Sequence, residues 1–130
     1  MGLSAVVGLL SSGFLEDYQD KALADRYLAL MSAGNLATSQ AVVTLVSERL
    51  EEGTDQTSLF RAPTMFNAAR TVGNALREAV EQDGAGVRAE GADPTASFLL
   101  AGQIKGRNPR LFQIYTAGNF IEATPETPFL

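Results

Sequence analysis

Apolar residues recur at helical spacing through the middle of the chain, and this pattern predicts two successive helices. The first helix follows Asn35, whose side chain is suited to accept a hydrogen bond from a first-turn N–H, and it ends at Gly53. The second helix has Pro63 in its first turn and ends at residues 83–86. The predicted core-facing stripes are Leu36, Val43, Val46 and Leu50 in the first helix, and Met65, Ala69, Val72, Leu76 and Val80 in the second.

Short apolar runs on both sides of the helices predict strands. Residues 27–31 form one before the helices, whereas the run at residues 3–10 fits either a strand or the start of a helix. Residues 96–104 indicate a strand that is buried on both faces, and residues 111–115 and 120–123 follow it after short turns. Strands joined by short turns form an antiparallel meander, so a block of helices between such strands predicts the α+β class.

Composition narrows the chemistry that the chain can carry. At 130 residues and 45% apolar residues, a single globular domain is expected. A net charge of −5 disfavours a nucleic-acid partner, and the absence of His and Cys excludes disulfides and thiolate metal sites. Glu48, Glu51 and Glu52 fit a solvated helix face, so we predict no metal and no cofactor. The apolar runs are too short to cross a bilayer, so we expect a cytoplasmic protein with no membrane partner.

One turn stands out as a candidate site, because the strand at residues 27–31 passes through Ser32, Ala33 and Gly34 directly into a helix. A helix that begins in this way presents backbone N–H groups at its N-terminus, where they can hold a developing negative charge. The alternative explanation for Gly34 is structural, namely a tight strand-to-helix turn.

Three segments of the chain are similar to a known family. Residues 30–42, residues 66–73 and residues 111–130 resemble the bacterial proteasome-like peptidases called Anbu, or ancestral β-subunit, which are N-terminal nucleophile hydrolases. The resemblance covers residues 27–130 and is incomplete at both ends. It implies a partial four-layer αββα fold with antiparallel sheets and two helices packed on one face.

The resemblance also implies a mechanism and a set of site residues. In the family, a Thr or Ser at the mature N-terminus attacks the peptide carbonyl while its own α-amino group acts as the base. Gly34 matches the glycine whose backbone N–H stabilises the oxyanion. Ser32, Leu36 and Gln40 match positions that line the substrate pocket, and the turn residues Ala33 and Asn35 join them as expected substrate contacts. The implied substrate is a peptide or unfolded protein, and the implied assembly is a homo-oligomer.

The first 26 residues do not resemble the family, so we expect an unmatched segment at 1–26 followed by a truncated proteasome-subunit-like domain at 27–130. Removal of Met1 would expose Gly2, which carries no nucleophile. Lys21 is near the position of the catalytic lysine, although it also fits a solvated lysine between Asp20 and Asp25.

Three functions therefore remain open. The first is a fragment or degraded member of a peptidase family that is inactive as this chain. The second is a non-catalytic structural subunit that assembles with proteasome-like partners. The third is an enzyme that uses another nucleophile, such as a serine paired with Lys21.

Overall fold

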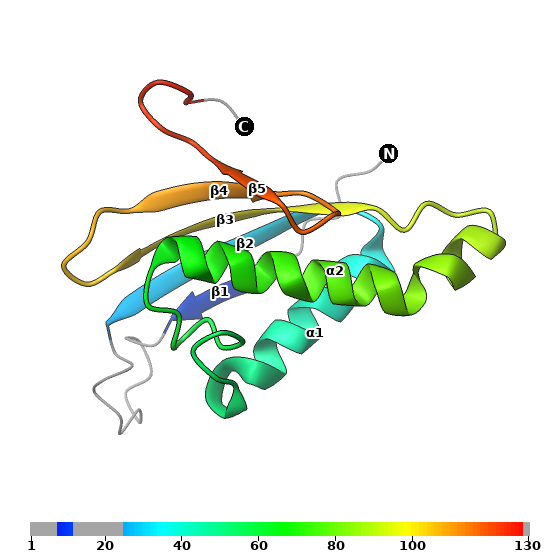
Figure 1. Cartoon of the computed structure of the whole chain (residues 1–130), viewed down its shortest axis with the longest axis horizontal. Helices are drawn as coiled ribbons and strands as arrows, with labels where there is room; N and C mark the ends of the chain where they lie inside the picture. The colour runs from blue at the N-terminus through cyan, green and yellow to red at the C-terminus, as the bar shows by residue number, and fades with distance from the viewer. Residues whose placement is uncertain (1–7, 12–24, 129–130) are drawn as a thin grey trace.

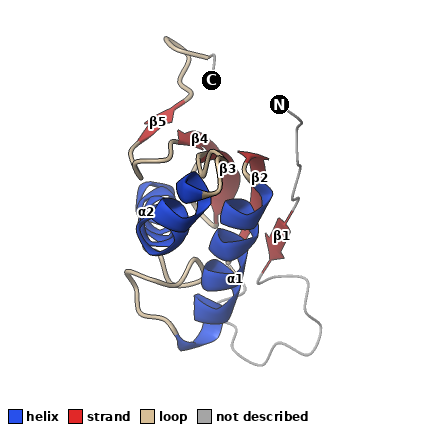
Figure 2. Ribbon diagram, turned by 90° about the vertical axis from the view of Figure 1, so that its right-hand side faces the viewer, coloured by secondary structure: helices blue, strands red, loops and turns tan. Residues whose placement is uncertain are grey.

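The strands that the structure describes form a single antiparallel sheet with two helices packed on one of its faces (Figures 1 and 2). The structure is a computed structural model, and it describes residues 8–11 and 25–128. The elements are β1 (Gly8–Ser11), β2 (Arg26–Gly34), α1 (Leu36–Glu52), α2 (Met65–Ala89), β3 (Ala96–Ile104), β4 (Arg110–Ile114) and β5 (Phe120–Glu122). The predicted α+β class is confirmed, and both predicted helices and the strands expected at residues 27–31, 96–104, 111–115 and 120–123 are present. Of the ambiguous run at residues 3–10, residues 8–10 belong to β1, and residues 3–7 lie outside the described residues.

The strands lie in the sheet in their order along the chain, from β1 to β5. Strands β3, β4 and β5 form the predicted meander, whereas both helices lie between β2 and β3 in sequence. Strands β2 and β3 pair along their whole length, from Arg26 opposite Ile104 to Gly34 opposite Ala96. This register brings the start of β3 to the end of β2, where the candidate turn lies.

Helix α1 has the predicted caps but presents a different face to the core. Asn35 caps its N-terminus and Gly53 its C-terminus. Leu36, however, was predicted to lie in the core and is 49% exposed. Thr38 and Ser39 are buried instead. Their hydroxyls donate to the carbonyls of Pro94 (2.8 Å) and Asn35 (2.9 Å). Because buried polar groups are tolerated once they are hydrogen-bonded, these hydroxyl residues hold core positions that hydrophobicity alone does not reveal.

Helix α2 is longer than predicted and begins later. Thr64 is the N-cap, so Pro63 precedes the helix and does not lie in its first turn. The helix continues through residues 83–86, because an internal glycine costs only about 1 kcal/mol relative to alanine and does not by itself end a helix. The actual stop is at Gly91, whose φ of +81° is the left-handed conformation that follows many helices, and its N–H donates to the carbonyl of Arg88.

The core lies between the helices and one face of the sheet. Alternate residues of β3 are fully buried against the helices, whereas the residues between them are only half-buried. The expectation that this strand is buried on both faces is therefore wrong for the described residues. The largest fully buried side chains are Phe98, Phe112, Leu28, Leu59, Met65, Leu76, Leu100 and Ile114.

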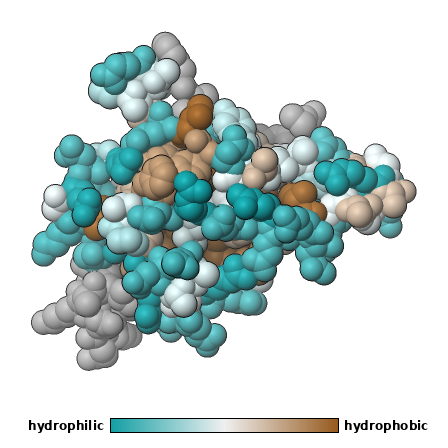
Figure 3. Space-filling view, viewed as in Figure 1, coloured by the Kyte–Doolittle hydropathy of each residue, from teal (hydrophilic) through white to brown (hydrophobic). Residues whose placement is uncertain are grey.

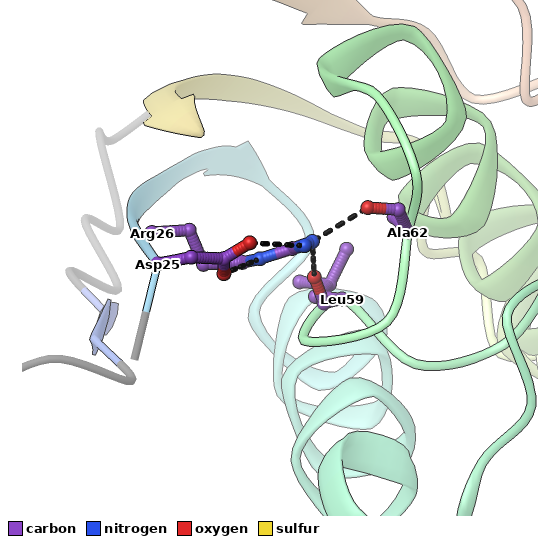
Figure 4. Close-up of polar contacts among 4 residues, drawn as sticks. All are labelled: Asp25, Arg26, Leu59 and Ala62. Carbon is purple, nitrogen blue, oxygen red and sulfur yellow. Dashed lines mark hydrogen bonds and ion pairs between the residues drawn. The ribbon is translucent and has the colours of Figure 1, made fainter. Parts of the chain in front are cut away.

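An arginine at the start of β2 joins the sheet to the loop between the helices (Figure 4). The side chain of Arg26 is only 7% exposed. Its Nη1 donates to the carbonyls of Leu59 (3.0 Å) and Ala62 (2.6 Å), and its Nε donates to the carboxylate of Asp25 (2.8 Å). The guanidinium therefore fixes the interhelical loop against the end of the sheet opposite Gly34.

Candidate functional site

The candidate turn is held by backbone contact between the end of β2 and the segment that leads into β3. Gly34 has a φ of +113°, and a Cβ atom there would lie 2.6 Å from the carbonyl oxygen of Thr95 and 2.9 Å from the Cα of Ala96. The N–H of the next residue, Asn35, donates to the same Thr95 carbonyl (2.9 Å). Only glycine fits this position, because both the backbone conformation and the close approach exclude a side chain.

The side chain of Asn35 uses both of its polar atoms. Its Oδ1 accepts from the N–H of Thr38 (2.9 Å), and its Nδ2 donates to the carbonyl of Asp93 (3.0 Å). The N–H groups of Asn35 and Thr38 are therefore already occupied, which corrects the expectation that this turn presents a set of free N–H groups. Gly34 itself also makes a polar interaction.

A carboxylate lies beside the turn and makes it more negative. The side chain of Asp93 accepts from the backbone N–H of Thr95 (3.0 Å), and this hydrogen bond lowers the pKa of Asp93. The group is thus ionised at neutral pH. Its negative charge opposes a free anion at this end of the sheet, so the turn is better suited to a polar carbonyl than to an anionic ligand.

The predicted substrate-contacting residues divide between different surfaces. Ser32 is 3% exposed, and Ala33, the next residue of β2, is half-buried on the opposite face of the sheet. Leu36 and Gln40 are exposed on α1, one helical turn apart. The described residues therefore do not gather the predicted set into one pocket, and Lys21 lies outside the described residues.

A shallow hollow of about 180 Å³ lies beside Ala33 on strands β2, β3 and β4. Ala33 pairs with Ser97 across the strands, and Met31 pairs with Leu99, which in turn pairs with Gln113. The hollow is lined by Met31, Ser32, Ala33, Ser97, Phe98, Leu99 and Gln113. None of these side chains titrates, so the hollow can accommodate an apolar group but cannot supply an acid or a base. Ser97, Leu99 and Gln113 carry no signal in the sequence that points to this site, because only the strand register brings them to the turn.

Other kinds of site find little support in the part of the chain that the structure describes. Within residues 8–11 and 25–128, no three His, Cys, Asp or Glu side chains lie close enough together to hold a metal ion. Among those residues there is also no helix with the length and apolarity needed to cross a membrane.

Comparison with known proteins gave matches among solved structures alone: no protein-family model and no curated protein matches the chain. Anbu from Yersinia bercovieri superposes with a TM-score of 0.73 at 38% identity, over 95% of this chain and 46% of that one. Anbu from a Hyphomicrobium strain gives 0.73 at 45% identity, over 95% and 45%. A helical assembly of the Anbu complex from Pseudomonas aeruginosa gives 0.72 at 43% identity, over 82% and 43%.

These matches show that the sheet and its two helices are part of the proteasome-like N-terminal nucleophile hydrolase fold. The chain belongs to the Anbu, or ancestral β-subunit, family of proteasome-like proteins. It spans a little under half the length of these structures.

Proposed function

We propose that this chain supplies the oxyanion-side turn of a proteasome-type peptide-hydrolysing domain and that it is inactive as an isolated chain. The observation that carries the proposal is the conformation of Gly34, held against Thr95 in a position that admits only glycine. The identity of 38–45% to Anbu structures supports the assignment to peptide chemistry.

The turn contributes to peptide hydrolysis through a backbone donor. Attack on a peptide carbonyl places negative charge on its oxygen, and a fixed N–H aimed at that oxygen lowers the barrier by about 2.7–4 kcal/mol. We assign this donor to Gly34 and the substrate contacts beside it to Ser32 and Ala33, which line the neighbouring hollow. Contacts of a substrate with Asn35, Leu36 and Gln40 stay predictions, because these residues lie at the start of α1 and not in that hollow. The ionised Asp93 carboxylate beside the turn opposes this developing charge, so the donor has to act against it.

The described residues place neither a His nor a Lys beside this donor, and the chain's α-amino group lies outside them. The chain contains no His, and the only lysine among residues 8–11 and 25–128 is Lys105. Lys105 directly follows β3, whereas Gly34 is paired with Ala96 at the opposite end of that strand. A hydroxyl nucleophile needs a base within hydrogen-bonding reach. We therefore propose that the isolated chain does not hydrolyse peptides and that Lys21 is the residue to test for a contrary role.

The face of the sheet that points away from the two helices is suited to contact a further layer of structure. Tyr27 (50% exposed), Met31 (42%) and Ile121 (45%) leave apolar surface in contact with solvent. Exposed apolar surface of this kind marks an interaction site. We propose that this face receives the second sheet of the four-layer fold. The expected boundary between residues 26 and 27 does not divide the sheet, because β1 (Gly8–Ser11) pairs with β2 across it.

The alternative function is a structural subunit without catalytic activity. One matching structure is a helical assembly of Anbu, which supports self-association of this chain as well. This alternative and the first proposal agree on inactivity and differ in assembly, so two measurements are needed.

The first measurement is hydrolysis of fluorogenic peptides by the purified chain, with Gly34→Ala and Lys21→Ala variants purified in parallel. We expect the three preparations to share the same background rate. A rate in the unmodified chain that both variants abolish would show an active enzyme and overturn the proposal. The second measurement is mass by light scattering over a concentration series. A discrete oligomer favours the structural subunit, and a monomer at all concentrations removes its support.

A further inference from the structure

An arginine lies over two contacting aromatic rings on the surface where α2 begins. The rings of Phe66 in α2 and Phe120 in β5 are 5.1 Å apart and meet edge to face. The Cζ atom of Arg70 lies 5.2 Å from the centroid of Phe66 and 5.4 Å from that of Phe120. Figure 3 shows an apolar patch in this part of the surface, above the start of α2, with polar residues around it. Two cation–π contacts thus fix the guanidinium in place.

The charge of Arg70 is not neutralised within the described residues. The ion pairs found there join Arg26 to Asp25, Arg49 to Glu78 and Arg110 to Glu122, and none involves Arg70. No hydrogen bond from its guanidinium to a described residue is present either. A guanidinium presents five N–H donors in a planar fork that matches a carboxylate. Because the rings already orient this fork, less conformational freedom is lost when it binds a ligand.

A hollow of about 490 Å³ adjoins this arginine. Asn67, Arg70 and Asn74 recur at intervals of three and four along α2, so their side chains lie on one face of the helix. The full lining is Asp55, Gln56, Pro63, Asn67, Arg70, Thr71 and Asn74. It therefore combines one cation with several amide groups, and the apolar ring of Phe66, which is 43% exposed, lies on the same turn of the helix.

The charges around the hollow favour a ligand with one negative charge over a ligand with several. Asp55 places one carboxylate in the lining, so the single positive charge of Arg70 is partly balanced. A dianionic phosphate or a polyanion would meet this carboxylate and a chain of net charge −5, whereas a single carboxylate requires only the Arg70 fork. The exposed ring of Phe66, beside the half-buried ring of Phe120, favours a ligand with an apolar group next to that carboxylate.

We propose that Arg70, Asn67 and Asn74 form a binding site for an acidic side chain of a partner polypeptide, with a neighbouring large apolar side chain packed on Phe66 and Phe120. The site is independent of the Gly34 turn, and its proposal does not depend on whether the chain hydrolyses peptides.

The test uses two small peptides that differ only in charge, Ac-Glu-Phe-NH2 and Ac-Gln-Phe-NH2. Each is titrated into the whole chain while the Nε–H resonance of Arg70 is followed by NMR. We expect the glutamyl peptide to bind about two- to fivefold more tightly than the glutaminyl peptide, as for other partly exposed ion pairs. We also expect added salt to reduce this preference.

Three variants test whether the preference for the glutamyl peptide arises at Arg70. Arg70→Gln removes the charge and should abolish the preference for the glutamyl peptide, whereas Phe66→Ala should weaken both peptides together. Arg107→Gln removes another exposed arginine, on the turn after β3, and should leave the preference unchanged. Circular dichroism checks that each variant is folded. Equal binding of the two peptides, no binding of either, or a preference that survives in Arg70→Gln would overturn the proposal. The proposal would also be overturned if the chemical shift of the Arg70 Nε–H in the unmodified chain did not change when the glutamyl peptide was added.

Discussion

Gly73 in α2 lies directly against Gly118 in the turn between β4 and β5. A Cβ atom on Gly73 would overlap the carbonyl oxygen of Gly118, and one on Gly118 would lie 2.8 Å from the carbonyl oxygen of Gly73. Gly118 also has a φ of +88°. The helix therefore contacts the sheet through two backbones with no side chain between them, and this contact sets how closely α2 packs on the meander.

Replacement of Gly73 by alanine should destabilise the protein by about 1–3 kcal/mol, because the added methyl group forces the helix away from the turn. Gly86 provides the matched control in the same helix, since a Cβ there meets no atom within 4 Å. Gly86→Ala should be neutral or should stabilise by about 0.5–1 kcal/mol through helix propensity. Urea denaturation measures both values, and equal effects at the two positions would contradict the close contact.

The candidate turn should be similarly intolerant of a side chain. Gly34→Ala combines an unfavourable φ of +113° with overlap on the Thr95 carbonyl. Gly106 has a φ of +82° but open space around its Cβ position, so Gly106→Ala isolates the conformational cost, about 1–3 kcal/mol. Gly34→Ala should cost more than Gly106→Ala in the same denaturation experiment. A smaller cost would mean that the contact with Thr95 does not constrain the turn.

The two hydrogen bonds of Asn35 can be separated by substitution. Asn35→Ala removes both and should cost about 0.5–2 kcal/mol, the usual value for a lost N-cap. Asn35→Asp keeps the acceptor for the N–H of Thr38 but loses the donor to the Asp93 carbonyl and adds a carboxylate near the ionised Asp93. Its stability in thermal unfolding should lie between those of the wild type and the alanine variant. If the aspartate variant matched the alanine variant, the cap to Thr38 would contribute nothing.

The buried Arg26 should be among the most sensitive charged positions. Arg26→Ala leaves the carbonyls of Leu59 and Ala62 without this donor and should destabilise by about 3 kcal/mol. Arg61 is the control, because it is exposed and, among the described residues, its side chain makes a single long hydrogen bond of 3.4 Å to the Glu51 carbonyl. Arg61→Ala should change the free energy of unfolding by less than about 0.5 kcal/mol. Comparable losses in the two variants would argue against a structural role for Arg26.

The ion pair between Arg110 and Glu122 should make stability depend on pH in acid. Two hydrogen bonds from the Arg110 guanidinium, at 2.6 and 2.8 Å, lower the pKa of Glu122 below its ordinary 4.5. A lowered folded-state pKa contributes stability above the unfolded-state pKa, and this contribution is lost as the pH falls through the folded-state pKa.

Glu122→Gln should therefore be less stable than the wild type at pH 7, by about 0.2–1 kcal/mol for a partly exposed pair. The difference should shrink as the pH falls below 4.5. Glu126, which is exposed and makes no ion pair within the described residues, serves as the control position. Chemical denaturation at several pH values measures the difference. A Glu122→Gln deficit that is constant with pH would contradict the pairing.

The helices, the strands and the class of fold follow from local patterns in the chain. The caps at Asn35 and Gly53, the apolar stripe of the second helix and the strand at residues 96–104 were all predicted correctly, because each depends on neighbours within a few positions. The same local logic misplaced Leu36 and the end of α2. There, one hydrogen bond from Thr38 to the distant Pro94 carbonyl and the left-handed conformation of Gly91 account for the difference.

The surroundings of the Gly34 turn depend on contacts between residues far apart in the chain. The pairing of β2 with β3 brings Asp93, Thr95 and Ser97 close to Gly34, although both helices lie between these residues in the sequence. No local pattern encodes that register. Likewise, the association of Arg70 with Phe120 depends on where β5 meets α2. The physical reason is that periodicity specifies which face of an element is apolar, whereas strand register and backbone contacts between glycines specify which residues meet.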